Sequence, residues 1–222
     1  MAEQAGRPPA GITREIEEQG FQHESALNAA WTGSRLALGA LTFLLGSFVF
    51  SFFYLRSLNS HRLWYPAGFP GPRQWSGALI MALVVGSAVV HALVLQRLKA
   101  GHKAPWMLGA ALALALGLGA IGVQIWQLLN EPFFPGSSGF ASVFTGATPV
   151  LMVVIFCAMI WLEILLVAAT KIPEIFFVEQ PPTYADAFAL QRFQARLSAF
   201  NLVWIYLASV ELLFWILFYL VH

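Results

Sequence analysis

The sequence contains few of the residues that build metal sites and disulfides. Its single cysteine, Cys157, lies within an apolar run, so neither a disulfide framework nor a Cys-x-x-Cys site can form. Of its five histidines, only His91 lies inside an apolar run, so this chain cannot place two histidines across one haem. Copper and zinc lack a ligand cluster for the same reason. We therefore predict no catalytic, cofactor-binding or metal site in this chain.

Charged residues are also scarce. They make up 10% of the chain, and the formal net charge of +1 provides no basic field for binding nucleic acid. Hydrophobic residues, in contrast, make up 59% of the chain, and the mean hydropathy is +0.70. This composition is typical of an integral membrane protein.

The apolar residues gather into five runs, each close to or above the ~20 residues that a helix needs to cross the ~30 Å hydrocarbon core. Barrel strands would instead show ~10-residue segments of alternating polarity. Continuous helices satisfy every backbone polar group within each run, as a lipid environment requires. We therefore predict an all-α, polytopic fold, with an N-terminal segment at 1–34 and a membrane domain at 35–222. The predicted spans are 35–57, 76–97, 104–130, 142–170 and 197–221.

A proline-rich segment separates the fourth run from the fifth. Pro173, Pro181 and Pro182 interrupt helical geometry there, since proline lacks the backbone N–H. Thr183 follows directly and is a good N-capping residue, so we predict that a helix begins near it.

The distribution of lysine and arginine predicts the orientation. Nine of these residues lie before the first span, between the second and third, or between the fourth and fifth, against three on the other side. Cytoplasmic loops are enriched in Lys and Arg, so we predict a cytoplasmic N-terminus and an outside C-terminus. The nine are Arg7, Arg14, Arg35, Arg97, Lys99, Lys103, Lys171, Arg192 and Arg196, and the three are Arg56, Arg62 and Arg73.

Basic and aromatic residues gather where the spans meet the interface. Tyr54, Tyr65 and Trp75 are expected to join Trp64 in an aromatic belt on the outer side. Basic side chains at these depths can reach lipid phosphates, although a solvated helix end is the simpler interpretation. The lipid headgroup candidates are Arg56, Arg62, Trp64, Arg97, Lys99 and Lys103.

Three ionisable residues lie within the spans: His91, Glu163 and Glu211. Each is costly in hydrocarbon unless it is paired or neutral, so such residues often mark function. Counting ~1.5 Å per residue from the cytoplasmic ends puts His91 and Glu163 at similar depths and Glu211 too far across to pair with Glu163. We therefore predict that His91 and Glu163 face the bundle interior and share a hydrogen bond, either directly or through one water molecule. A proton relay, a carboxyl bonded to a neighbouring helix, and a Glu163 that points at a partner subunit are the alternatives.

Three segments resemble subunit III of the haem-copper oxidases, the cytochrome c oxidase group. "FVFSFFYLRS" at the end of the first span is similar to the "aYFYLR" of that family. "GSSGFASVFTGATPV" is similar to "ygsvFFmlTGFHGlHV", and "IYLASVELLFWILFYL" to "YWHFVDVVWLFLFtflY". The five spans and the predicted orientation match the five-helix form, and the resemblance covers roughly residues 30–222.

The chain departs from the family at its polar positions. Leu41 stands where the family usually carries a buried glutamate, and Ala208 replaces a histidine. Thr148 and Leu151 stand where the family has two histidines, while Glu211 matches its aspartate. The chain therefore resembles a divergent, structural member.

The resemblance implies a non-catalytic subunit of a respiratory terminal oxidase in the bacterial cytoplasmic (inner) membrane. Subunit III packs beside the haem-bearing subunit I, binds lipid and supports proton uptake. Haem and copper are then expected in the partner subunit, in a complex with other respiratory subunits. Two alternatives remain open. One is a small five-helix transporter or channel. The other is a membrane anchor of another quinol-linked respiratory complex, with haem shared through His91.

Overall fold

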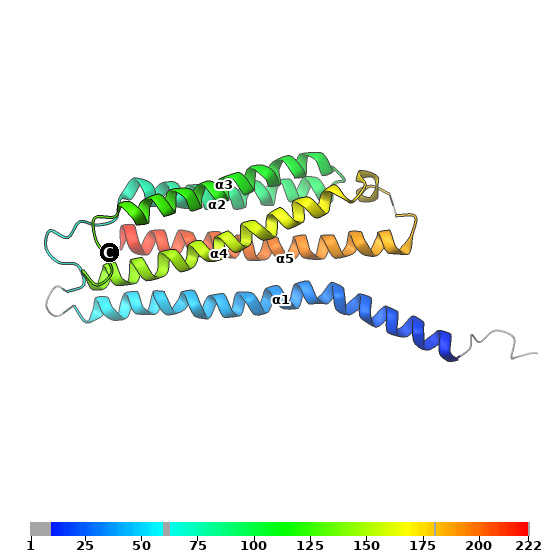
Figure 1. The fold of residues 1–222 in the computed structure, drawn as a ribbon, viewed down its shortest axis with the longest axis horizontal. Coiled ribbons are helices and arrows are strands. Elements are labelled where there is room, and N and C mark those ends of the chain that lie inside the picture. The colour runs from blue at the N-terminus through cyan, green and yellow to red at the C-terminus, as the bar shows by residue number, and fades with distance from the viewer. Residues whose placement is uncertain (1–9, 60–62, 180, 222) are drawn as a thin grey trace, which may run out of the picture.

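The computed structural model describes residues 10–59, 63–179 and 181–221, and within residues 10–19 and at residue 23 it describes the backbone alone. These residues fold into five long α-helices and two short helical segments (Figure 1). The all-α prediction is confirmed. The helices are α1 (Ala10–Ser57), α2 (Gln74–Lys99), α3 (Lys103–Asn130), α4 (Gly139–Thr170) and α5 (Tyr184–Trp215), with the 3₁₀ helix η1 (Glu174–Phe177) and the π-helix η2 (Ile216–Leu220).

Five helices in the described part of the chain are long and apolar enough to cross a membrane. The first four contain the predicted spans, and the fifth, Tyr184–Leu220, covers the predicted 197–221 except for its last residue, so the protein is a multi-pass membrane protein by helix length and hydropathy. The first and last helices extend well beyond the predicted spans, because polar turns continue each helix outside the apolar run. The 48 residues of α1 measure about 70 Å, more than twice the hydrocarbon thickness, and they form one continuous helix across residue 34.

The start of α5 is set by the predicted cap. Thr183 has an extended backbone, and its Oγ1 accepts a hydrogen bond from the backbone N–H of Asp186 at 3.2 Å. The same hydroxyl donates to the Asp186 carboxylate at 2.5 Å. A capping residue and an acidic side chain in the first turn both stabilise a helix N-terminus.

The helices α4 and α5 lie between α1 and a hairpin formed by α2 and α3 (Figure 1). The hairpin turns at Gly101, whose φ of +87° suits glycine. The chain's C-terminus and the end of α1 lie at one end of the bundle, which we call the C-terminal end, and the N-terminal part of α1 runs past the bundle at the opposite end (Figure 1).

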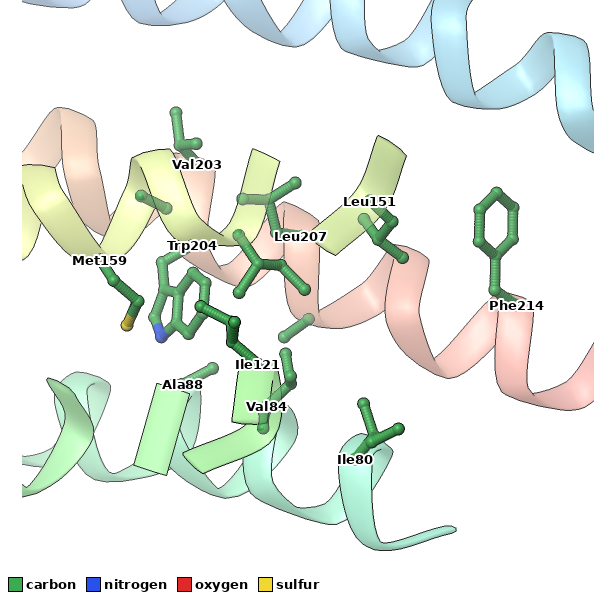
Figure 2. Packing of buried hydrophobic residues seen from close by; sticks show 14 of the residues in the cluster. Ile80, Val84, Ala88, Ile121, Leu151, Met159, Val203, Trp204, Leu207 and Phe214 are labelled. Carbon is green, nitrogen blue, oxygen red and sulfur yellow. The ribbon is translucent and has the colours of Figure 1, made fainter. Parts of the chain in front are cut away.

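Small residues let the helices approach closely. A Cβ at Gly109 would overlap Val94 across the α2–α3 hairpin, and one at Gly117 would overlap Met159 of α4. Such packing is the usual source of helix association in lipid. The resulting core surrounds Trp204, which is fully buried between the helices (Figure 2).

Large apolar side chains also cover the outside of the bundle. Phe43 and Phe50 of α1 are 84% and 69% exposed, and Leu129 of α3 is 80% exposed. In a soluble protein such a surface would aggregate, whereas in a membrane it faces lipid or partner helices.

Candidate functional site

His91 is completely buried, but its partner differs from the predicted one. Its Nδ1 lies 3.3 Å from Oδ1 of Asn201 on α5, and its ring packs edge-on against Phe200 at 5.0 Å. A neutral imidazole can donate from Nδ1 to an amide oxygen. His91 therefore joins α2 to α5 rather than α2 to α4.

Glu163 lies on the exposed face of α4, so the expected His91–Glu163 hydrogen bond is wrong. The prediction rested on depth, and depth does not fix the direction in which a residue points. The neighbouring Leu162 is completely buried while Glu163 is exposed, because consecutive residues of a helix point ~100° apart.

Glu211 is 7% exposed and lines a small cavity of about 20 Å³ inside the bundle. Thr148 and Leu151 line the same cavity, so three of the positions compared above with the family's polar residues lie around one space. Residues from α2, α3, α4, α5 and η2 enclose it: Gly77, Ile80, Gln124, Gln127, Phe144, Thr148, Leu151, Glu211, Phe214, Trp215, Phe218 and Tyr219.

Polar side chains that the sequence analysis did not identify connect this cavity to the C-terminal end. Nε2 of Gln127 donates to the Tyr219 hydroxyl at 2.5 Å, and Nε2 of Gln74 donates to the Tyr219 carbonyl at 3.1 Å. Gln124 and Gln127 are three residues apart, so they share one face of α3. Two glutamines three residues apart within an apolar run could have been recognised from the sequence as a polar position inside the bundle, and both are buried.

Glu131 follows α3 near the mouth of this polar region. Burial raises the pKa of its carboxyl, while the nearby Gln127 amide and the charge of Arg73 oppose that rise. The Arg73 guanidinium also lies over the Trp126 ring, 5.2 Å from its centroid. The C-terminal end of the hairpin thus carries a compact set of polar and aromatic groups.

Trp64 does not lie at the membrane surface as predicted. It is 3% exposed and packs edge-on against Phe52 at 5.0 Å and Phe140 at 5.8 Å. The loop after α1 folds back over the bundle, because the backbone N–H of Phe140 donates to the Trp64 carbonyl at 3.2 Å. An aromatic residue in a loop can lie in an interface belt or be buried where the loop covers the end of the bundle. Tertiary packing places Trp64 in the buried position.

The basic headgroup candidates have several environments. Arg56, Arg97 and Lys99 are exposed, as lipid contact requires, and Arg62 lies outside the described residues. Lys103 is half-buried, and its Nζ donates to the Ile172 carbonyl at 2.5 Å, so its nearest partner is the C-terminal end of α4.

A larger cleft, of about 760 Å³, opens at the opposite end between α4, α5 and α1. Its floor is apolar and includes Trp161 and Leu165. Its rim carries the exposed Lys171 and Arg192 and the half-buried Arg196, three of the residues whose distribution predicted the orientation. An apolar floor with a cationic rim has the chemistry of a site for an acyl chain and its phosphate.

The three segments that carry the family resemblance meet at the C-terminal end. Phe218 of η2 contacts Phe52 of α1 at 5.9 Å, Phe140 of α4 at 6.0 Å and Phe144 of α4 at 5.2 Å. Edge-to-face geometry of this kind adds stability beyond burial alone. Segments far apart in the sequence therefore form one aromatic cluster.

Comparison with known protein families finds no matching family, and comparison with curated proteins finds no match. In the part of the chain that the structure describes, no group of three or more His, Cys, Asp or Glu side chains is arranged to hold a metal ion.

Proposed function

We propose that this protein is a non-catalytic integral membrane subunit, similar to subunit III, of a bacterial respiratory terminal oxidase. The main observation in support is the aromatic cluster of Phe52, Phe140, Phe144 and Phe218, because it brings together the three segments that resemble the family. A chance likeness of three separate segments gives no reason for them to pack together.

The positions that correspond to the family's polar residues support the same proposal. Thr148, Leu151 and Glu211 line one cavity, while Leu41 and Ala208 do not, so three of the five positions compared with the family's polar residues lie together. The replacement of the histidines favours a structural role. In this proposal the partner subunit supplies the haem, the copper and the redox chemistry.

The basic-rimmed cleft supports the lipid-binding part of the proposal. With a cytoplasmic N-terminus, Lys171, Arg192 and Arg196 would face the leaflet that carries anionic lipid. A phospholipid there places its phosphate among these cations and its chain against the apolar floor. Bound lipid would then fill the cleft between α4 and α5, beside Ala30 of α1.

The assembly experiment purifies the tagged full-length chain from its native membrane in a mild detergent. We expect haem- and copper-containing subunits to co-purify at fixed stoichiometry, because in this proposal part of the exposed apolar surface of the bundle packs against partner helices. Purification as a haem-free homo-oligomer would refute the proposal and favour a transporter. Co-purification with a copper-free, quinol-linked complex would favour the membrane-anchor alternative.

Native mass spectrometry of the same preparation tests the lipid site. We expect Arg192→Ala combined with Arg196→Ala to lose bound anionic phospholipid, while the control Arg73→Ala retains it, since Arg73 is exposed and lies outside the cleft, at the C-terminal end of the bundle. Equal amounts of bound phospholipid in both variants would show that the cleft is not the lipid site.

A further inference from the structure

Two buried oxygen atoms beside the small cavity have no hydrogen-bond donor among the described residues. They are Oε2 of Glu211 and Oε1 of Gln124, whose side chains are 7% and 3% exposed. Both residues line the same cavity. A buried acceptor without a donor is costly, and the cost is greater in a low-dielectric interior.

The cavity has the size and polarity to hold a water molecule that would donate hydrogen bonds to these oxygen atoms. Its volume is about 20 Å³, and one water molecule needs roughly 10–15 Å³ on the same measure. Bound water in proteins makes two to four hydrogen bonds to buried polar groups. Glu211, Gln124, Thr148 and Tyr219 supply such groups from α5, α3, α4 and η2.

Polar groups also connect the cavity with the C-terminal end. Gln127 lines the cavity and donates to the Tyr219 hydroxyl, and Glu131 lies one helical turn beyond Gln127. Both carboxylate oxygens of Glu131 are buried, whereas Gln74, whose Nε2 donates to the Tyr219 carbonyl, is exposed, so this end of the polar region reaches the molecular surface at Gln74. In the opposite direction along α5, Leu207 lies one turn and Trp204 two turns before Glu211, and both are fully buried in the apolar core (Figure 2).

We propose that the cavity is a binding site for one water molecule, which bridges Glu211 and Gln124 and exchanges the Glu211 proton with the aqueous phase at the C-terminal end. The Glu211 carboxyl releases its proton to this water as the water passes one of its own protons to the Tyr219 hydroxyl oxygen, and the Tyr219 hydroxyl releases its original proton to solvent water at the C-terminal end, so Tyr219 is also unchanged. A carboxylate remains at Glu211, the water is unchanged, and the proton reaches bulk solvent. The reverse transfer restores the neutral carboxyl, which is the favoured form in an apolar interior. This inference does not depend on the proposed oxidase assembly.

Few charged or titratable groups compete with Glu211 for this role. Among the described residues that line the cavity, Tyr219 is the other titratable group, while α2, α3 and α4 contribute Gly77, Gln124, Gln127 and Thr148, which do not titrate. Glu131 and Arg73 form the next layer at the C-terminal end. The rate of proton exchange at the cavity therefore measures proton transfer between Glu211 and the C-terminal end through Tyr219.

Infrared spectroscopy of the full-length chain, kept in lipid with any co-purifying subunits, tests the inference. Glu211→Gln identifies the carboxylic C=O band of Glu211 by its loss from a difference spectrum. On transfer to D₂O we expect this band to shift in the folded protein. Gln124→Leu should slow the shift about tenfold or more, because it removes one hydrogen-bonding partner of the water and leaves an apolar wall.

Two further variants make the outcome decisive. Tyr219→Phe keeps the ring and removes the hydroxyl, so it should also slow the exchange, whereas Gln96→Leu, at an exposed position of α2, should leave it unchanged. Circular dichroism and a monodisperse elution profile establish that each variant is folded. The inference is overturned if Glu211→Gln removes no carboxylic band, if the band never exchanges, or if Gln124→Leu and Tyr219→Phe both exchange at the wild-type rate.

Discussion

Gly77 should be among the least replaceable residues of the bundle. It lies near the start of α2 with the Tyr219 ring of η2 directly against it, and a Cβ added at Gly77 would overlap that ring. Tyr219 is 6% exposed and is held by Gln127 and Gln74, so it has little room to move aside. Gly77→Ala therefore forces either α2 or η2 out of place.

The expected cost follows from three terms. Overpacking a buried site costs about 1–3 kcal/mol. Displacing Tyr219 also weakens its hydrogen bond with Gln127, which adds roughly 0.6 kcal/mol for a bond of this kind in a membrane protein. The better helix propensity of alanine returns up to about 1 kcal/mol. We therefore expect Gly77→Ala to destabilise the protein by roughly 0.5–3.5 kcal/mol.

Gly86→Ala is the matched control, since Gly86 lies on the same helix and a Cβ there would meet no atom within 4 Å. It shares the gain in helix propensity but not the clash, so it should be neutral or stabilising by up to about 1 kcal/mol. The free energy of unfolding of both variants can be measured by titrating SDS into mild-detergent micelles and following helix content by circular dichroism.

A second-site change separates the clash from other effects of Gly77→Ala. Replacing Tyr219 with leucine removes the obstructing ring, so the double variant should be less destabilised than the sum of the two single variants. Equal stabilities of Gly77→Ala and Gly86→Ala, or strict additivity with Tyr219→Leu, would refute the close contact between α2 and η2.

The same SDS titration checks three further predictions. Trp64→Ala should lower the free energy of unfolding by about 3 kcal/mol, because it removes the indole ring from a buried aromatic cluster. A loss below roughly 1 kcal/mol would indicate that Trp64 faces lipid instead. Asn201→Ala should cost about 1 kcal/mol through loss of the His91 hydrogen bond, whereas Glu163→Gln should change stability by less than roughly 0.5 kcal/mol because Glu163 is exposed. Burial raises the pKa of Glu131, so its protonated form stabilises the fold below the ordinary value of 4.5, and this contribution is lost as the pH rises through the raised value; Glu131→Gln should abolish that part of the pH dependence.

The sequence by itself determined the number and type of the transmembrane helices. Apolar runs of this length in water-free surroundings can satisfy their backbone groups only as helices, so composition and run length were sufficient. It also determined where α5 begins, because the capping bond of Thr183 is local and involves a residue three positions away. Such features depend on neighbours along the chain, which a sequence displays directly.

Tertiary structure alone decided which side chains meet. His91 bonds Asn201 and not Glu163, and Trp64 caps the bundle from inside, because each helix must rotate to bury the face that packs best against its neighbours. That choice is collective, and no residue's depth or type encodes it. The cavity around Glu211 arises in the same way: five helical segments contribute to its wall, and only their packing brings a glutamate, two glutamines and a tyrosine from distant parts of the chain into one buried space.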